Sequence, residues 1–291
     1  MYIELSIFTI TSKKVVFIEI HVMDNILNAV NVVIDAIDNL DVRESLSDSY
    51  YDSIEALNII EGFFKEFTSK KWTINAKRIF LKNWRSPGYG SASFCALTFR
   101  ILQLCDPLNT SKEQEMLLKS AMQIAEIAHE DVGVHGINHQ ELYEQFAATI
   151  TGDDEWKLNK YQVPNIKSFL TNSRTYRQNG EDLKYAITLS LPEELYNHGE
   201  FTFIAPLFTN WHKDILDLPS ENRKNDLKFI IDHLGETESH HFTSAIDGLK
   251  NYCLAFSLNL DTSILYNCNK NLLNNMASYY QKLMLAIVNA N

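Results

Sequence analysis

The spacing of apolar residues after Asp24 is the feature that most constrains the fold. Apolar side chains recur there three and four residues apart, as in Ile26, Val30, Ile34 and Ile37, which is the period of an amphipathic α-helix. Similar spacing returns in segment after segment toward the C-terminus. Only 10 Gly and 6 Pro interrupt the 291 residues, and such a low content disfavours a β-rich fold. The sequence therefore predicts an all-α protein.

The first 23 residues follow another pattern. Two runs rich in β-branched and aromatic residues, 2–10 and 13–22, meet at a polar Thr-Ser-Lys-Lys stretch, which is typical of a β-hairpin. The chain is long enough to bury a sizeable core. We therefore expect two parts, a small N-terminal β-hairpin appendage over residues 1–23 and a helical bundle over 24–291.

Individual helices are expected where the period is strongest, and the polar stretches 46–52 and 151–162 are expected to separate them. The expected helices cover about 24–37, 54–67, 74–84, 92–104, 111–131, 139–150, 163–177, 181–191, 193–207, the segment from 226 to a break at 259–261, and 271–288.

Charge and composition narrow the class of partner. The net charge of −11 disfavours a nucleic acid or an anionic membrane surface. The four cysteines form no CxxC pair, which favours free thiols in a reducing compartment. No apolar run approaches the length of about 20 residues that a membrane helix needs. We expect a cytoplasmic protein that acts on a small molecule without nucleic-acid or membrane partners, and a homodimer built on the N-terminal hairpin is a further expectation.

The segment 228–247 concentrates groups that bind metals. If it forms one helix, His233 and His240 lie two turns apart on one face, with Glu236 between them and Thr237 beside it. Imidazoles and carboxylates on one helical face suit a metal site inside a helix bundle. His241 falls on the neighbouring apolar stripe. A His-rich solvated turn is the alternative interpretation.

Two other segments carry carboxylates in suitable places. Glu126 and Glu130 are four residues apart in the expected helix 111–131, so their side chains share a face. Glu200 stands in the apolar run EFTFIAPLF, where a carboxylate is uncommon unless it is paired or bound to a metal. A solvated helix start at Gly199 is the alternative for Glu200.

In their order and spacing these residues resemble the haem-oxygenase-like diiron oxidases and oxygenases. Three signals carry the resemblance over residues 111–248, about half of the chain. Carboxylates and a glycine at 130–133 precede His139-Gln-Glu-Leu-Tyr, and Glu200 follows in an apolar helix. The third signal is His233, Thr237 and His240, where the family has His, Asp and His at the same spacing.

The resemblance implies an up-down bundle of seven helices that holds iron. It places ligands at Glu130, His139, Glu200, His233 and His240, with Glu126 or Asp131 as alternatives to Glu130. Thr237 departs from the family because a hydroxyl is a poor substitute for a carboxylate at ferrous iron, and Glu236 is the candidate to replace it. A diiron enzyme, a mononuclear enzyme and a fold without this chemistry all stay open.

The expected activity follows from the resemblance. One or two Fe²⁺ ions per chain would activate dioxygen as co-substrate for a non-haem iron oxidase or oxygenase. Its substrate would resemble an amino acid, an amine or a fatty acid. Two rival functions remain: a non-enzymatic binding or interaction protein on the same bundle, and a metal-free relative similar to the thiaminase-like or pyrroloquinoline-quinone-forming enzymes.

Overall fold

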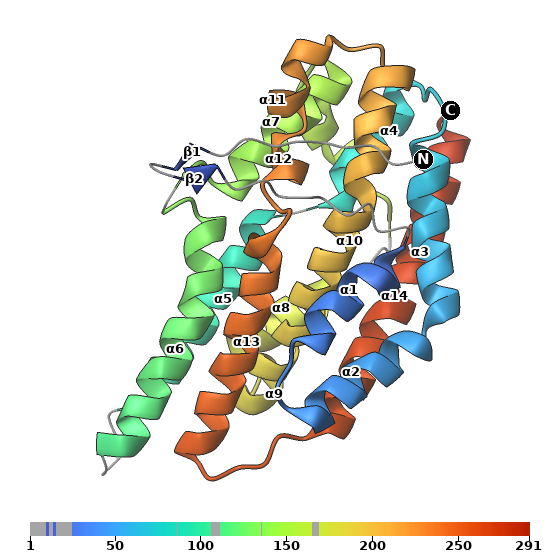
Figure 1. The fold of residues 1–291 in the computed structure, drawn as a ribbon. Coiled ribbons are helices and arrows are strands. Elements are labelled where there is room, and N and C mark those ends of the chain that lie inside the picture. Colours follow the sequence, from blue (N-terminus) through green and yellow to red (C-terminus); the bar gives the residue numbers. More distant parts are fainter. Residues whose placement is uncertain are drawn as a thin grey trace.

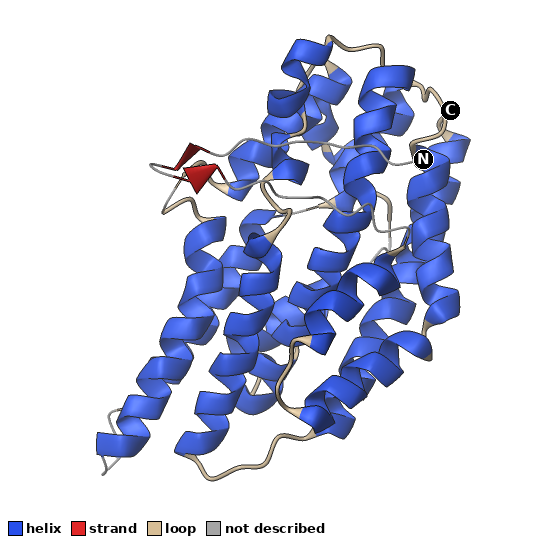
Figure 2. Ribbon diagram, in the orientation of Figure 1, coloured by secondary structure: helices blue, strands red, loops and turns tan. Residues whose placement is uncertain are grey.

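The computed structural model is a bundle of α-helices, which confirms the predicted all-α class (Figures 1 and 2). It describes residues 10–11, 14–15, 25–85, 87–105, 111–134, 136–164 and 169–291. The longer helices are α1 Ile26–Asp35, α2 Leu40–Tyr51, α3 Ile54–Phe67, α4 Ile74–Trp84, α5 Pro87–Leu102, α6 Ser111–Asp131, α7 His139–Thr151, α8 Phe169–Asn179, α10 Ser190–Asn210, α13 Glu236–Ala255 and α14 Thr262–Asn289. The shorter ones are α9 Leu183–Thr188, α11 Arg223–Asp226 and α12 Lys228–Ile231.

The predicted N-terminal hairpin is not seen as an element spanning the first 23 residues. Only β1 Ile10–Thr11 and β2 Lys14–Val15 are described in that region, and they pair antiparallel with Ile10 opposite Val15. The rest of the expected hairpin lies outside the described residues. The division into an appendage and a bundle at residue 23 therefore stays a prediction.

Helix α2 forms where the sequence suggested a polar stretch. The side chain of Asn39 caps it by accepting a hydrogen bond from the backbone N–H of Val42 at 3.0 Å. Val42, Leu46 and Tyr50 recur every four residues and are buried, and the helix packs on α14. A narrow apolar stripe on an otherwise polar helix is therefore enough to place α2 in the bundle.

Aromatic side chains fill the core where α3, α4, α10 and α14 meet. The ring centroids of Phe67 and Phe80 are 4.0 Å apart, and the rings of Trp84 and Phe208 stack at 5.5 Å. These rings are at most 4% exposed. Large buried aromatic surfaces stabilise the bundle and fix the C-terminal end of α4, which contributes Trp84 and Arg85 to the cavity described below.

Helix α1 approaches α10 closely at Gly199. A Cβ atom at this position would lie 2.7 Å from a methyl group of Val30 and 2.9 Å from one of Ile26. The carboxylate of Glu61 on α3 also accepts a hydrogen bond from the backbone N–H of Ile26 at 2.9 Å. Gly199 is therefore needed for packing in the middle of α10, rather than starting a helix.

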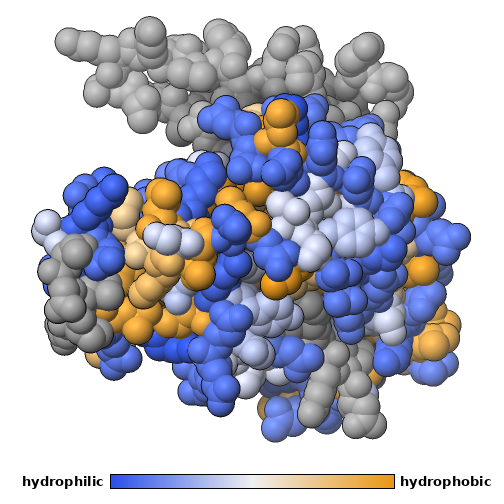
Figure 3. Space-filling model, turned by 90° about the horizontal axis from the view of Figure 1, so that it is seen from below, coloured by the Kyte–Doolittle hydropathy of each residue, from blue (hydrophilic) through white to orange (hydrophobic). Residues whose placement is uncertain are grey.

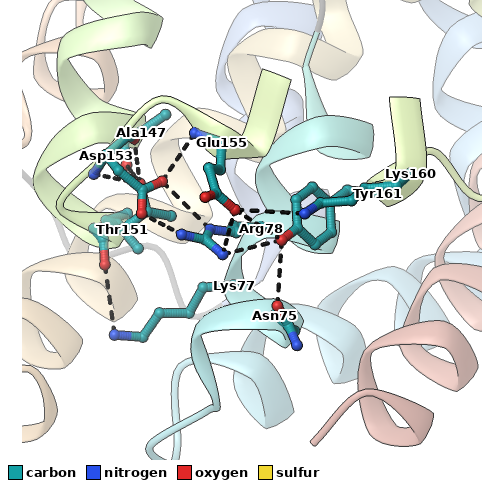
Figure 4. A network of polar contacts seen from close by, with 10 residues as sticks. Asn75, Lys77, Arg78, Ala147, Thr151, Asp153, Glu155, Lys160 and Tyr161 are labelled. Carbon is teal, nitrogen blue, oxygen red and sulfur yellow. Dashed lines mark hydrogen bonds and ion pairs between the residues drawn. The ribbon is translucent and has the colours of Figure 1, made fainter. Parts of the chain in front are cut away.

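The segment 151–162 is folded against α4, whereas the sequence suggested a polar linker. It contains two short 3₁₀ helices, η1 Glu155–Lys157 and η2 Asn159–Tyr161. Arg78 of α4 forms ion pairs with Asp153 and Glu155 and donates a hydrogen bond to the Tyr161 hydroxyl at 3.0 Å (Figure 4). These bonds hold the segment against α4, directly after the end of α7.

Seen from the lower end of the bundle, exposed apolar side chains form a patch in the part of the molecule where α6 lies (Figure 3). Phe99 of α5 and Met122 of α6 are 62% and 60% exposed. The homodimer expected at the N-terminal hairpin stays a prediction. None of the described helices is long and apolar enough to cross a membrane.

Candidate functional site

A cavity opens in the middle of the bundle beside the C-terminal end of α4. Its volume is about 90 Å³, several times the 10–15 Å³ or so that one water molecule needs. Four aromatic rings form part of its wall, together with Gly90 and Asn197. The charged and titratable side chains that line it are Arg85, Asp131, His139, Arg174, Glu193, Glu194, His233 and His241. The pocket is therefore small and lined by both charged and aromatic side chains.

A tight turn after α6 brings Asp131 and His139 together. Gly133 has a φ of +79°, and a Cβ atom there would lie 2.6 Å from the backbone nitrogen of Asn138, so a side chain is excluded. Asn138 then caps α7, and Nδ1 of His139 lies 2.8 Å from Oδ1 of Asp131. The other Asp131 oxygen accepts a hydrogen bond from Ser91 at 2.9 Å. The carboxylate therefore orients the imidazole with Nδ1–H toward itself.

His233 lies directly against His139, with ring centroids 4.3 Å apart. Its Nδ1 is hydrogen-bonded to the carbonyl oxygen of Phe229, and its ring stacks on Phe201 at 4.2 Å. Burial, followed by the neighbouring His139, holds the pKa of His233 well below its usual range. His233 is therefore a neutral imidazole whose Nδ1 carries the proton and whose Nε2 carries the lone pair.

The expected single helix over 228–247 is broken, and this decides which later histidine reaches the cavity. Helix α12 ends at Ile231, α13 begins at Glu236, and Gly235 between them has a φ of +77°. His241 is buried in the cavity wall, with Nδ1 3.6 Å from a Glu194 oxygen, whereas His240 is exposed. The sequence did carry a signal for His241, namely its place on the apolar stripe of α13.

Glu200 lies one layer behind the cavity wall and is fully buried. One of its oxygens accepts hydrogen bonds from Trp84 Nε1 at 3.1 Å and Arg85 Nη2 at 2.5 Å. The other accepts from the hydroxyls of Tyr196 and, at 2.9 Å, Tyr280. Burial, and then the Glu200 charge, raises the pKa of both tyrosines, which therefore keep their protons as donors. Four donors from this chain thus surround the carboxylate.

A second ion pair was not anticipated from the sequence. Glu193 of α10 binds Arg177 of α8 at 2.8 Å and also accepts from Ser173, and Arg177 Nε donates to Ser93 of α5 at 2.9 Å. Burial is the main cause that raises the pKa of Glu193. Arg174, one turn before Arg177, lines the cavity. No local motif marks these residues because their partners come from three different helices.

The residues predicted to bind metal are distributed unevenly. His139 and His233 meet in the cavity wall, and Glu200 lies behind it. Glu126 is half-buried and does not line the cavity. The side chains of Glu130, Glu236 and Thr237 lie outside the described part of the structure. Whether any of these residues binds a metal stays a prediction.

The comparisons with known proteins bear on the fold. No family model and no curated protein matches the chain. Among solved structures, the fold is similar to the crystal structure of a TenA homolog from Pseudomonas syringae pv. tomato str. DC3000, with a TM-score of 0.54 and 10% sequence identity. The match covers 84% of this chain and 93% of that protein. TenA proteins have a helical fold similar to the haem-oxygenase-like bundle, so the expected architecture is supported at this level.

The predicted non-haem iron oxidase or oxygenase function is wrong. A solved structure that shares the fold is a TenA homolog rather than a diiron oxygenase. Within the described ranges, no group of three or more His, Cys, Asp or Glu side chains could hold a metal ion. Two features of the structure explain why these residues form no such group. Four hydrogen-bond donors surround the Glu200 carboxylate, and the break at Gly235 leaves His240 exposed. The described residues thus form no site for the implied iron pair, and the prediction of Fe²⁺ and dioxygen as cofactors stays a prediction.

Proposed function

We propose that the protein is an acid–base enzyme for a small polar molecule, with His139 and His233 as its working pair. The observation that carries this proposal is the contact of the two imidazoles in the cavity wall, 4.3 Å apart, each fixed through Nδ1 by a different acceptor. Because Nδ1 of each ring is held by an acceptor, we assign the proton chemistry of both rings to Nε2.

The two rings are held in different environments, which suits opposite roles. Asp131 beside His139 favours the protonated imidazole there, whereas the aromatic surroundings of His233 and the adjacent His139 oppose a charge on His233. A single proton shared by the pair therefore resides on His139. We assign His139 as the general acid and His233 as the general base for a molecule bound in the cavity that both rings line.

The cavity limits the size and the polarity of the substrate. Its volume of about 90 Å³ admits a small molecule, and the rings of Trp84, Phe94, Phe201 and Phe229 provide flat apolar walls. Similarity to the fold of a TenA homolog is consistent with an enzyme of this kind, and the proposal places its chemistry on the residues of this chain.

Proton exchange is the most direct test because it does not require the natural reaction to be known. A panel of small keto acids, amides and hydroxy acids is incubated with the protein in D₂O, and deuterium uptake and product formation are followed by NMR. We expect exchange or turnover with at least one compound. Replacing His139 or His233 by Asn should lower that rate by about 10²–10⁴-fold.

His240 supplies the matched control, since it is the same residue type on the adjacent helix but is exposed. The His240→Asn variant should keep the wild-type rate. Activity that survives in both His139→Asn and His233→Asn would contradict the proposal, and so would a wild-type protein that accelerates none of the compounds.

A further inference from the structure

Arg174 is a cation of the cavity wall whose hydrogen bonds are incomplete. Within the described part of the chain it makes no ion pair, and its Nε atom is buried without a hydrogen-bond partner. Burial lowers the pKa of this guanidinium, the nearby Glu193 carboxylate raises it, and the nearby Arg177 lowers it. A partly buried guanidinium with an unused donor is costly unless an acceptor joins it.

The neighbouring carboxylates are already engaged elsewhere. Glu193 is bonded by Arg177 and Ser173, and Asp131 is bonded by His139 and Ser91. Arg177 also keeps one buried nitrogen, Nη2, without a partner. The α8 side of the cavity therefore has more guanidinium donors than acceptors to match them.

Gly90 of α5 leaves room directly beside this cation. A Cβ atom built at Gly90 would stand 3.9 Å from Arg174 Nη2 and 4.0 Å from Asp131 Oδ2. Both distances are ordinary van der Waals contacts, so an alanine fits the empty protein without collision. The same methyl group would occupy the space that a ligand needs to reach Arg174.

We infer that the ligand of this cavity carries an oxyanion, a carboxylate or a phosphate, that binds Arg174 beside Gly90. The planar guanidinium suits the two oxygens of such a group, and the aromatic rings of the wall would cover the remainder of the molecule. This inference deepens the proposed function by naming the class of ligand, and it rests on the same cavity.

Titration calorimetry with three probes tests the inference. Benzoate presents a planar carboxylate on a ring, benzamide has nearly the same shape without the charge, and inorganic phosphate presents the other oxyanion alone. We expect benzoate or phosphate to bind the wild type, and benzamide to bind about 10–100-fold more weakly than benzoate. Binding of benzoate alone identifies a carboxylate site, and binding of phosphate alone a phosphate site.

Two variants locate the anion. Arg174→Gln should weaken oxyanion binding about 10–100-fold, and Gly90→Ala should weaken it while thermal unfolding stays at the wild-type temperature. Arg223→Gln is the matched control, because Arg223 also has a buried Nε without a partner but lies outside the cavity; it should bind as the wild type does.

Several results would overturn the inference: no binding of either oxyanion, equal binding of benzoate and benzamide, or unchanged binding in Arg174→Gln. The His139→Asn variant separates this inference from the proposed function. Oxyanion binding that persists in His139→Asn, but is lost in Arg174→Gln, supports the anion site even if the acid–base role fails.

Discussion

Replacing Glu200 by alanine should be one of the most damaging single changes in this protein. The carboxylate is fully buried and receives hydrogen bonds from Trp84, Arg85, Tyr196 and Tyr280. Glu200→Ala leaves these donors facing an empty space and separates a mostly buried guanidinium from its counter-ion. Breaking a buried ion pair on one side typically costs about 3–5 kcal/mol.

The structure adjusts this figure in two ways. The Arg85 side chain is 13% exposed and also bonds Asn197 at 2.9 Å, so part of its charge stays solvated and the ion-pair loss lies near the lower limit. Tyr196 and Tyr280 are only 1% exposed, so water does not readily replace Glu200 as the partner of their hydroxyls, and each unsatisfied buried donor adds about 1 kcal/mol or more. We therefore expect a loss of about 4–5 kcal/mol, a large share of the 5–15 kcal/mol or so that stabilises a typical domain.

Urea unfolding followed by circular dichroism measures this loss. Glu200→Gln keeps the shape and one acceptor oxygen, so it should lose about half as much. The control is Glu66→Ala, because Glu66 is 49% exposed in its pair with Lys70 and should change stability by less than about 0.5 kcal/mol. A loss below about 1 kcal/mol for Glu200→Ala would refute the view that this carboxylate organises the core.

Other predictions concern the packing, thiols and charges described above. Gly199→Ala should lower stability by about 1–3 kcal/mol because the new methyl group collides with α1. Gly62 lies on an exposed helix face with open space around it, so Gly62→Ala should raise stability by about 0.5–1 kcal/mol. Thermal unfolding of the two variants checks both values. Burial raises the pKa of the Cys268 thiol to about 11, so at pH 8 only about one in a thousand of these thiols is ionised, and mass spectrometry after iodoacetamide should show Cys95, which is exposed, modified long before Cys268. The hydrogen bond from Arg78 lowers the pKa of Asp153 in the folded protein. The ionised Asp153 carboxylate therefore stabilises the fold above the ordinary Asp pKa of about 3.9, and this stabilisation is lost as the pH falls through the lowered pKa of the folded state. Asp153→Asn should be less stable than the wild type at pH 7 and equal to it in strong acid.

Much of the fold was predictable because burial of one helical face leaves a period in the sequence. Helix α3 was predicted with its observed bounds, and its buried residues follow the expected three- and four-residue spacing. Helix α2 was missed because its apolar stripe is only one residue wide, and charged residues occupy the other faces. The segment 151–162 was missed because Arg78 on another helix supplies the bonds that order it, and local sequence does not record such a partner.

The site was predictable only where its parts are close in sequence. Asp131 and His139 are joined by a turn whose glycine is visible in the chain, so their proximity could be anticipated from residues 130–139. The pairing of Glu193 with Arg177, and the crowding of Arg174 beside it, depend on how α8 and α10 pack. Glu200 was correctly recognised as an unusual carboxylate, but its burial is compensated by Arg85 and three neutral donors from α4, α10 and α14.

A single glycine decides which histidine of α13 faces the cavity. Gly235 has φ +77° and ψ −127°, and no atom lies within 4 Å of a Cβ built there. Gly235→Ala should therefore destabilise the protein only through backbone strain, by about 1–3 kcal/mol. The substitution should also favour the joining of α12 and α13 into one helix. In that helix His240, instead of His241, would point toward His233. Gly136→Ala is the control, because its Cβ also meets open space at an ordinary φ. We expect the Gly235 variant to unfold at a lower temperature than the Gly136 variant and to lose the proton-exchange activity of the proposed function. Equal unfolding temperatures would mean that something other than glycine's backbone freedom holds the break and places His241 beside Glu194.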